Sequence, residues 1–311
     1  MGKTAFLFPG QGSQAVGMGK ALREAGGAAA ATLTEADEAL GFSLTGLMFD
    51  GPAETLTLTE NTQPALVTTG VAAFRLVCER TGARPDYVAG HSLGEYAALC
   101  AAGALSFADA VRLVRLRGEA MRHATPPGVG GMAAMLNMTR EDVEAVCRDA
   151  AAATGEVCVP ANFNGPGQIV ISGHKGAVER AMALAKERGA RRCLALPVAA
   201  PFHSPLMAPA AQRMAEALAG VAFQELSVPL VANVTAAETS SGEVCKRLLV
   251  EQVTGSVRWE ESMRRLLELG VDAFVEVGTG KVLSGLIKRI DDSVRVFTLN
   301  GPEDLAALDA L

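Results

Sequence analysis

The sequence contains no Cys-x-x-Cys pair, and its cysteine and histidine residues do not stand at the spacings of a zinc site. Its six cysteines therefore predict neither a structural metal ion nor a framework of disulfides. Thiols scattered in this way are typical of reduced, buried residues in a cytoplasmic protein. We accordingly expect no metal site and a cytoplasmic location.

Basic charge and long apolar runs are lacking as well. Lys and Arg number 28 against 34 Asp and Glu, a formal net charge of −6, which offers no general attraction to nucleic acid or anionic lipid. The most apolar stretch, residues 96–111, contains Asp109 and is shorter than the roughly 18 to 20 residues that cross a bilayer. The apolar residues before Pro9 are too few for the core of a signal peptide. We therefore expect neither a nucleic-acid partner nor a membrane partner.

Short β-rich runs, bounded by Gly, Pro or Asn, alternate with longer helical patterns along the chain. This alternation predicts an α/β protein with a mainly parallel sheet. The predicted strands are residues 4–8, 87–91, 228–233, 272–277 and 294–299, and the predicted helices are residues 22–39 and 63–79.

The middle of the chain has a different pattern. Strands are predicted at residues 132–136, 157–161, 168–172 and 192–196, and helices at residues 139–153, with Thr139 as N-cap, and 175–188. This β-α-β-β-α-β order is the ferredoxin-like split βαβ pattern. Proline residues near both ends of the segment mark it as an insertion. We predict a large domain of residues 1–126 and 198–311 and an inserted subdomain of residues 127–197.

The sharpest local signal is Gly-x-Ser-x-Gly at residues 90–94, between a predicted strand and a helix-competent stretch. This pattern is typical of a nucleophile elbow. Small residues at Gly90 and Gly94 let the incoming strand and the outgoing helix pass without collision. Ser92 then stands at a helix N-terminus, where the N–H of Leu93 and the helix dipole favour a developing negative charge. Ser92 is therefore the predicted nucleophile.

A serine nucleophile requires a base, and the chain has only four histidines. His91 adjoins the nucleophile inside the turn, where neighbouring side chains diverge, so we interpret it as a structural donor. His123 ends a predicted helix and His174 begins one, which are positions typical of capping or surface residues. His203 lies in an irregular, proline-flanked loop where the chain returns to the large domain. Elimination and position favour His203 as the general base.

Two glycine-rich segments resemble nucleotide-binding loops without completing either pattern. Residues 10–15 satisfy Gly-x-Gly-x-x-Ala, yet no acidic residue ends a second strand about 20 residues later, as a dinucleotide site requires. Residues 278–281 do not match the phosphate loop, because Val275 and Val282 replace its first Gly and its Ser or Thr. The first loop is better interpreted as a source of backbone N–H donors that face Ser92.

Several longer blocks point to one family. They are FPGQGSQ (8–14), TQPA (62–65), GHSLGEYAAL (90–99), RLRGEAM (115–121), NFNGPGQIVISG (162–173), PFHSPLM (201–207), QVTGSVRW (252–259) and EVGTGKVL (276–283). In these blocks, which span essentially the whole chain, the sequence closely resembles the malonyl-CoA:acyl carrier protein transacylases and the related acyltransferase domains of fatty-acid and polyketide synthases. The resemblance implies a hydrolase-like α/β large domain with a ferredoxin-like insert.

The resemblance also implies roles for individual residues. Ser92 is implied as the nucleophile that accepts the acyl group, and His203 as its general base. The backbone amides of Gln11 and Leu93 are implied as the oxyanion hole. The main-chain carbonyl of Gln252 is implied as the acceptor for the Nδ1–H of the histidine, in place of the acidic third residue of a usual triad.

A second group of residues is implied in substrate recognition. Arg117 matches the arginine that holds the substrate carboxylate in the family, a task that a planar guanidinium performs through two parallel hydrogen bonds. Gln63 and Asn162 are implied as pocket residues, and the sequence leaves open that both are structural hydrogen-bonding groups. His91 completes the predicted substrate site together with Phe202, which resembles the residue found in members that use malonyl units.

The resemblance implies that the chain transfers a malonyl group from malonyl-CoA to the phosphopantetheine thiol of an acyl carrier protein, by a ping-pong mechanism through a Ser92 acyl-enzyme. Malonyl-CoA and the holo carrier protein are the expected partners. No cofactor is expected, and we expect a stand-alone monomer. An acidic carrier protein suits a basic surface near the domain cleft, for which the candidates are Lys186, Arg188, Arg191, Arg192, Lys281, Lys288 and Arg289.

Two other functions share part of this pattern. A serine hydrolase has the same elbow and a late histidine, and Arg117 distinguishes the two because only the transferase needs to select a carboxylate-bearing acyl group. A noncatalytic scaffold that binds carrier proteins has no need of an intact pair of Ser92 and His203.

Overall fold

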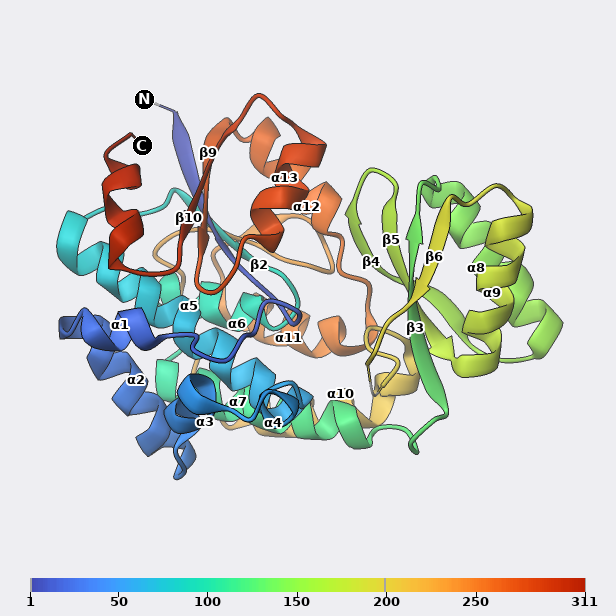
Figure 1. Cartoon of the computed structure of the whole chain (residues 1–311), viewed down its shortest axis with the longest axis horizontal. Helices are drawn as coiled ribbons and strands as arrows, with labels where there is room; N and C mark the ends of the chain where they lie inside the picture. Colours follow the sequence, from blue (N-terminus) through green and yellow to red (C-terminus); the bar gives the residue numbers. More distant parts are fainter. Residues whose placement is uncertain (1, 199, 311) are drawn as a thin grey trace.

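The computed structural model describes residues 2–198 and 200–310. These residues form two lobes, each built on one β-sheet, and the smaller lobe comes from the middle of the chain (Figure 1). The strand order is β10-β9-β1-β2-β7-β8 in the large lobe and β4-β5-β3-β6 in the small lobe. The strands are β1 (Lys3–Phe8), β2 (Tyr87–Gly90), β3 (Gly130–Leu136), β4 (Cys158–Gly165), β5 (Gln168–His174), β6 (Arg192–Ala195), β7 (Leu230–Val231), β8 (Glu238–Thr239), β9 (Val271–Val277) and β10 (Arg295–Leu299).

Helices pack around the large sheet, and α8 and α9 belong to the small lobe (Figure 1). Among the helices that the structure describes, none combines the length and the apolar character needed to cross a membrane. The helices are α1 (Lys20–Glu24), α2 (Gly27–Leu40), α3 (Leu44–Asp50), α4 (Ala53–Leu56), α5 (Thr59–Thr81), α6 (Gly94–Ala101), α7 (Phe107–His123), α8 (Arg140–Thr154), α9 (Lys175–Glu187), α10 (Ala208–Ala219), α11 (Gly242–Thr254), α12 (Trp259–Glu268) and α13 (Val282–Ile290), with 3₁₀ turns η1 (Pro205–Met207) and η2 (Pro302–Ala310).

Strand β1 lies inside the large sheet, parallel to β2 on one side and to β9 on the other. Its successive residues are buried in different cores: Phe6 packs in one cluster and Leu7 in another. Burial on both faces is typical of a parallel strand covered by helices on each side. Phe8 pairs with Gly90 at the carboxyl ends of β1 and β2, so the loops that follow these two strands begin side by side. Ligand sites of α/β sheets gather at this edge.

The small lobe has the predicted β-α-β-β-α-β order, and its strand pairs are antiparallel. The predicted ferredoxin-like class is therefore confirmed. The predicted N-cap of α8 is confirmed too, because Thr139 Oγ1 accepts a hydrogen bond from the Asp142 N–H at 3.1 Å. The strands of this sheet lie between residues 130 and 195, within the insert predicted at residues 127–197. That boundary stays a prediction, and residues 1, 199 and 311 of the predicted large domain lie outside the described residues.

The two faces of the small sheet have different neighbours because side chains alternate along a strand. Ala133 and Met135 of β3 pack into the core that the sheet forms with α8 and α9. Met132 and Ala134 of the same strand, with Val170 of β5, line a cavity on the opposite face. The small sheet thus has one face in its own core and the other toward the large lobe.

Three predicted elements differ from the structure. The helix predicted at residues 22–39 is divided into α1 and α2, because Gly26 and Gly27 adopt φ angles of 71° and 55°. The strand predicted at residues 228–233 is reduced to β7, which leaves Asn233 outside the sheet. The strand predicted at residues 157–161 continues as β4 to Gly165, so the turn before β5 is shorter than expected.

The lobes are joined by main-chain pairing between the large lobe and β4. The N–H of Val257 donates to the carbonyl of Ala161 at 2.8 Å, and the carbonyl of Val257 accepts from the N–H of Phe163 at 2.9 Å. The hydroxyl of Ser256 also donates to the carbonyl of Pro160, at 2.7 Å. These bonds cover an edge strand that would otherwise expose unpaired backbone groups.

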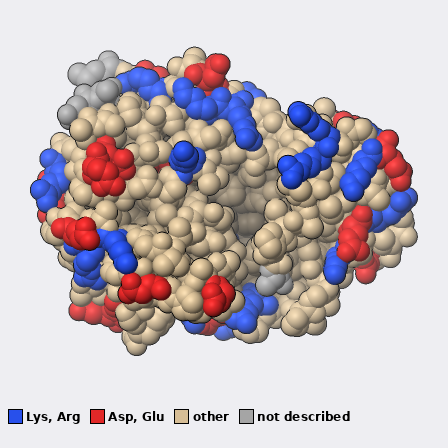
Figure 2. All heavy atoms as spheres, viewed as in Figure 1, with Lys and Arg blue, Asp and Glu red and all other residues tan. Residues whose placement is uncertain are grey.

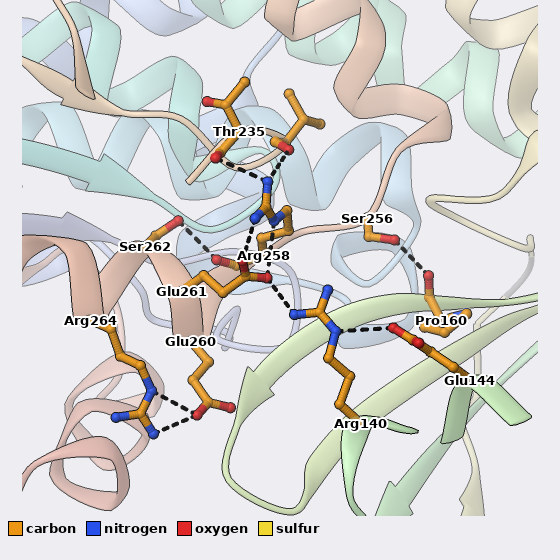
Figure 3. Close-up of polar contacts among 11 residues, drawn as sticks. Arg140, Glu144, Pro160, Thr235, Ser256, Arg258, Glu260, Glu261, Ser262 and Arg264 are labelled. Carbon is orange, nitrogen blue, oxygen red and sulfur yellow. Dashed lines mark hydrogen bonds and ion pairs between the residues drawn. The ribbon is translucent and has the colours of Figure 1, made fainter. Parts of the chain in front are cut away.

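Charged side chains reinforce this contact in what we call the junction network, Arg140, Glu144, Arg258 and Glu261 (Figure 3). Arg140 of α8 donates to Glu144 at 3.0 Å and to Glu261 of α12 at 2.7 Å. Glu261 also accepts from Arg258 Nε at 3.0 Å, and Arg258 Nη1 donates to the carbonyl of Thr235 at 3.0 Å. The network therefore extends from the small lobe to the loop that follows β7.

Candidate active site

The turn between β2 and α6 presents Ser92. Its φ angle is 52°, in the left-handed region that residues other than glycine rarely adopt. A Cβ atom at Gly90 would lie 2.0 Å from the main-chain carbonyl carbon of Gly94, and one at Gly94 would lie 2.2 Å from the carbonyl oxygen of Phe8. Both positions therefore require glycine, and the strand and helix approach each other as closely as a nucleophile elbow needs.

Ser92 Oγ lies 2.8 Å from Nε2 of His203, which comes from the loop before η1. Nδ1 of His203 lies 2.9 Å from the main-chain oxygen of Gln252 and 3.2 Å from that of Gly255. Because a carbonyl oxygen only accepts, Nδ1 carries the ring proton and Nε2 accepts the serine hydroxyl. The pair thus has the arrangement of a nucleophile and its base, oriented by neutral carbonyls.

The environment of His203 keeps its imidazole neutral. The residue is only 4% exposed. Burial, followed by the positive charge of Arg117, lowers the pKa of His203 to about 3, although the hydrogen bond to the Gln252 carbonyl acts in the opposite direction. The ring is therefore unprotonated at physiological pH and ready to accept a proton.

Arg117 extends from α7 into the same site and is 1% exposed. Nη1 donates to Gln63 Oε1 at 2.8 Å, while Nη2 donates to Gln252 Oε1 at 2.8 Å and to Ser92 Oγ at 3.1 Å. Burial lowers the pKa of Arg117, yet a guanidinium remains protonated in proteins. These three partners are uncharged, so the buried cation is suited to bind an anionic group of a substrate.

A cavity of about 290 Å³ lies beside the serine and the histidine. Figure 2 shows the surface hollowed between the two lobes. Gln252 is fully buried behind the guanidinium and the imidazole that it contacts. All the other predicted site residues line the cavity: Gln11, Gln63, His91, Ser92, Leu93, Arg117, Asn162, Phe202 and His203.

Two predicted oxyanion donors come from the adjoining loops. Gln11 follows β1, and Leu93 is the N-cap residue of α6. Within the described part of the chain, neither backbone N–H donates to another backbone carbonyl. Both residues line the cavity beside Ser92, and the oxyanion-hole role of their N–H groups stays a prediction.

His91 is held by residues at the lobe junction. Its Nε2 lies 2.8 Å from the side-chain oxygen of Asn164, and its ring centroid lies 5.3 Å from that of Trp259. Burial lowers the pKa of His91, against the effect of the bond to Asn164. The ring is thus held by its hydrogen bond with Asn164. The predicted pocket residue Asn162 lies two residues before Asn164 in β4 and is 7% exposed.

Sequence reasoning missed two buried residues of this site. Asn233 Oδ1 accepts from the Ser92 N–H at 2.7 Å, and its Nδ2 donates to the carbonyl of Gly90 at 2.6 Å. Glu95 Oε2 accepts from Gln252 Nε2 at 2.9 Å and from the Asn233 N–H at 3.1 Å. The sequence offered one signal for Glu95, which is a single acid in the otherwise apolar first turns of α6. Asn233 had only its place at the end of a predicted strand.

The other two histidines lie away from the site. Nδ1 of His123 is 2.8 Å from the carbonyl of Glu119 in the last turn of α7. His174 is the N-cap residue of α9, and its Nδ1 accepts from the N–H of Val157 at 3.0 Å. Within residues 2–198 and 200–310, no group of three or more His, Cys, Asp or Glu residues is placed to hold a metal ion.

Comparison with known proteins gives consistent matches. Residues 5–299 match the family model of the acyl transferase domain. The malonyl CoA-acyl carrier protein transacylase of Bacillus subtilis (strain 168) is 49% identical over 305 residues, which cover 98% of this chain and 96% of that protein. The crystal structure of the acyl-carrier-protein S-malonyltransferase from Burkholderia pseudomallei 1710b matches with a TM-score of 0.96 at 47% identity, covering 99% of this chain and 100% of that one. A malonyl-transacylase solved in complex with its type II polyketide synthase acyl-carrier protein matches with a TM-score of 0.96 at 42% identity, covering 99% of this chain and 100% of that one.

Proposed function

The chain belongs to the acyl transferase family, and from that premise we propose that it transfers a malonyl group from malonyl-CoA to the phosphopantetheine thiol of an acyl carrier protein. Relatives named malonyl CoA-acyl carrier protein transacylase support this donor and this acceptor. The complex with a type II polyketide synthase carrier supports a carrier protein as the partner. The carrier serves fatty-acid or polyketide synthesis. We propose that the reaction uses no cofactor, and malonyl-CoA enters it as a substrate.

In the first half-reaction, Nε2 of His203 takes the hydroxyl proton of Ser92 while Oγ attacks the thioester carbonyl. The oxyanion of the tetrahedral intermediate accepts hydrogen bonds from the backbone N–H groups of Gln11 and Leu93, each worth about 3 to 4 kcal/mol in such sites. The intermediate collapses, and the coenzyme A thiolate leaves with the proton from His203. The 2.8 Å contact between Ser92 and His203 supports this step.

In the second half-reaction, the carrier thiol gives its proton to Nε2 of His203 and attacks the malonyl ester on Ser92. Collapse of the second intermediate returns the proton to Ser92 Oγ and leaves the malonyl group on the carrier as a thioester. The same base therefore serves both halves of a ping-pong reaction.

We assign the malonyl carboxylate to Arg117. In a malonyl group the carboxylate is only one methylene away from the reacting carbonyl, so the cation that binds it must lie close to the nucleophile. The 3.1 Å contact between Arg117 Nη2 and Ser92 Oγ meets this requirement. The carboxylate replaces that contact, while the bonds to Gln63 and Gln252 hold the guanidinium in place.

The carrier protein is proposed to dock on the rim of the hollow, where Figure 2 shows Lys and Arg side chains on both sides. Arg289 of α13 is the candidate with the most direct link to the cavity, because it donates to Gln168 at 2.5 Å and Gln168 lines the cavity.

The cysteines of the described chain form no disulfide, which supports the proposed cytoplasmic location. The monomeric state stays a prediction.

The contact between Ser92 and His203 beside Arg117 carries the proposal, and intact-protein mass measurement tests it. After incubation with malonyl-CoA alone, we expect the chain to gain one malonyl group, which moves to the carrier when holo carrier protein is added. The Ser92→Ala chain, with unchanged thermal unfolding, should gain none. Steady release of malonate without a carrier would identify a hydrolase. The absence of any acylated serine would leave a carrier-binding scaffold.

A further inference from the structure

One buried acid in the site has no part in the reaction described above. Glu95 lies in the first turn of α6 and is 1% exposed. Its Oε2 accepts from the Gln252 side chain at 2.9 Å and from the Asn233 N–H at 3.1 Å. Its Oε1 is buried and has no hydrogen-bond partner among the described residues. A carboxylate that is desolvated and only half satisfied is costly, so its presence requires an explanation.

The side chain of Gln252 connects this acid to the buried cation. Its Oε1 accepts from Arg117 Nη2 at 2.8 Å, and its Nε2 donates to Glu95 Oε2 at 2.9 Å. The main-chain oxygen of the same residue accepts from Nδ1 of His203 at 2.9 Å. One glutamine therefore touches the acid, the cation and the base, and a carboxylate fixes which end of its amide faces the guanidinium.

The charges around Glu95 explain what the acid does. Arg117 of α7 is a buried cation, and the three side chains that it contacts are uncharged. Tyr96 of α6 and Cys245 of α11 also interact with Glu95, but burial raises the pKa of each to about 12, so both are neutral near pH 7. His203 is neutral for the reasons given above. When Glu95 is ionised, it and Arg117 are thus an anion and a cation joined through an amide.

We propose that Glu95 is the counter-charge of Arg117 while the site is empty, and that it takes up a proton from solvent when a malonyl carboxylate binds the guanidinium. The inference rests on the proposed function. Glu95 touches neither the acyl group nor the reacting atoms, so it is a positioning residue that acts through Gln252. The proton balance is simple: one proton passes from the buffer to the carboxylate, and no bond of the substrate changes.

The energetics of the buried acid fit this exchange. Burial raises the pKa of Glu95 to about 7, against the bonds from Gln252 and Asn233 and the charge of Arg117, which lower it. The empty site therefore holds this proton only part of the time at neutral pH. A second carboxylate beside Arg117 disfavours the ionised form further, so the occupied site keeps the proton.

Proton linkage makes this measurable. If malonyl-CoA binds only the form of the protein in which Glu95 carries a proton, its Kd rises by about tenfold between pH 6 and pH 8. The reason is that an increasing fraction of Glu95 must first be protonated. The sign follows from the direction of transfer: binding that takes up a proton weakens as pH rises. Acetyl-CoA carries the same phosphates and has no acyl carboxylate, so its Kd should not show this additional rise.

The experiment uses the full chain with Ser92→Ala, which is not acylated. Malonyl-CoA and acetyl-CoA are titrated into it by calorimetry at pH 7 in two buffers of different ionisation enthalpy. We expect an uptake of about half a proton for malonyl-CoA beyond that for acetyl-CoA. In a Ser92→Ala/Glu95→Gln chain, the amide keeps a bond to Gln252 and cannot titrate. The uptake should disappear, and the Kd for malonyl-CoA should be equal at pH 6 and pH 8.

Two histidines, His91 and His203, also line the cavity, so a bound carboxylate can influence either one. The chains Ser92→Ala/His203→Ala and Ser92→Ala/His91→Ala separate them from Glu95. Uptake that persists in both chains supports Glu95 even if the Glu95→Gln chain does not fold. Uptake that vanishes in one of them assigns the proton to that histidine and overturns the proposal.

Different results refute the role of Glu95 and the proposed function. Malonyl-CoA that binds Ser92→Ala without additional proton uptake removes the role of Glu95 and leaves the transferase intact. Malonyl-CoA that neither binds more tightly than acetyl-CoA nor acylates the unmodified chain removes the proposed function itself.

Discussion

The polar cluster around Ser92 and the junction network between the lobes both contain arginines, but they differ in exposure. At the junction, the side chains of Arg140 and Glu261 are 42% and 30% exposed, whereas Arg117 in the site is 1% exposed. Water therefore screens the junction pairs and replaces a partner that is lost. In the site, the polar groups are buried, so removing a hydrogen-bond partner leaves a desolvated group without a replacement from water.

The two regions also differ in what neutralises their arginines. In the junction network, Arg140 and Arg258 each contact a carboxylate directly. In the site, Arg117 contacts only uncharged side chains, and its acid lies one amide further away. The first arrangement is suited to holding two lobes together. The second leaves a cation available for a ligand. We therefore expect substitutions in the site to change the acylation reaction. Substitutions at the junction should change the free energy of unfolding, and only slightly.

The largest effect should follow removal of the base. We expect His203→Ala to lower the rate of Ser92 acylation by malonyl-CoA by about 10²- to 10⁴-fold, the usual contribution of a general base. Rapid quenching followed by mass measurement gives the rate. Gln11→Ala is the comparison variant, because it removes a side chain and retains the backbone donor, so it should keep more activity. Wild-type acylation in the His203→Ala chain would refute the assignment.

Arg117→Ala should have the next largest effect, on selectivity. Loss of a charge-assisted contact to the carboxylate should lower the ratio of malonyl to acetyl loading by about 10- to 100-fold. Competition between malonyl-CoA and acetyl-CoA, with intact-mass detection, measures the ratio. Arg115→Ala is the matched control on the same helix, because Arg115 pairs with Glu119 and is outside the cavity lining. An unchanged ratio in Arg117→Ala would remove its role.

The junction network should respond much less. Arg140→Ala breaks the pair that crosses between the lobes, and we expect the free energy of unfolding to fall by less than about 1 kcal/mol, with acylation almost unchanged. Urea unfolding measures the loss. Arg264→Ala is the control, because its partner Glu260 lies on the same helix (Figure 3). A loss of several kcal/mol in Arg140→Ala alone would show that the junction resembles the buried site after all.

Acidification should have the smallest effect of all on the base. Because the pKa of His203 lies near 3, lowering the pH from 7 to 5 leaves the imidazole unprotonated. The kcat/KM for malonyl-CoA, which reports the free enzyme, should therefore show no loss of base over this range. A fall of kcat/KM to half as the pH drops from 7 to 6 would mean that solvent reaches the histidine more freely than its 4% exposure indicates.

The elbow and the small lobe could be predicted from the sequence because both depend on short-range rules. The spacing of Gly90 and Gly94 is set by local contacts between a strand and the helix that follows it. The β-α-β-β-α-β order follows from periodicity within segments. Where a boundary depended on neighbours, the prediction was wrong, as in the strand expected at residues 228–233, of which only β7 pairs in the sheet.

Contacts between residues that lie far apart in the chain were harder to predict from the sequence. His203 was favoured as the base by elimination among the histidines, whereas the roles of Arg117 and Gln252 came from resemblance to a family. Glu95 and Asn233 were missed, because Glu95 meets its partners across 138 and 157 residues of chain. No periodicity or motif spacing encodes a contact of that kind.

The sequence by itself determined an α/β chain with a strained serine turn and an inserted βαββαβ segment, since glycine sterics and side-chain periodicity act over a few residues. Only the tertiary structure decided that a guanidinium and a buried carboxyl group meet at the side-chain amide of Gln252, while an imidazole meets its main-chain oxygen. The reason is that desolvation and charge pairing depend on distances in space, and these are set when the two sheets and their helices pack together.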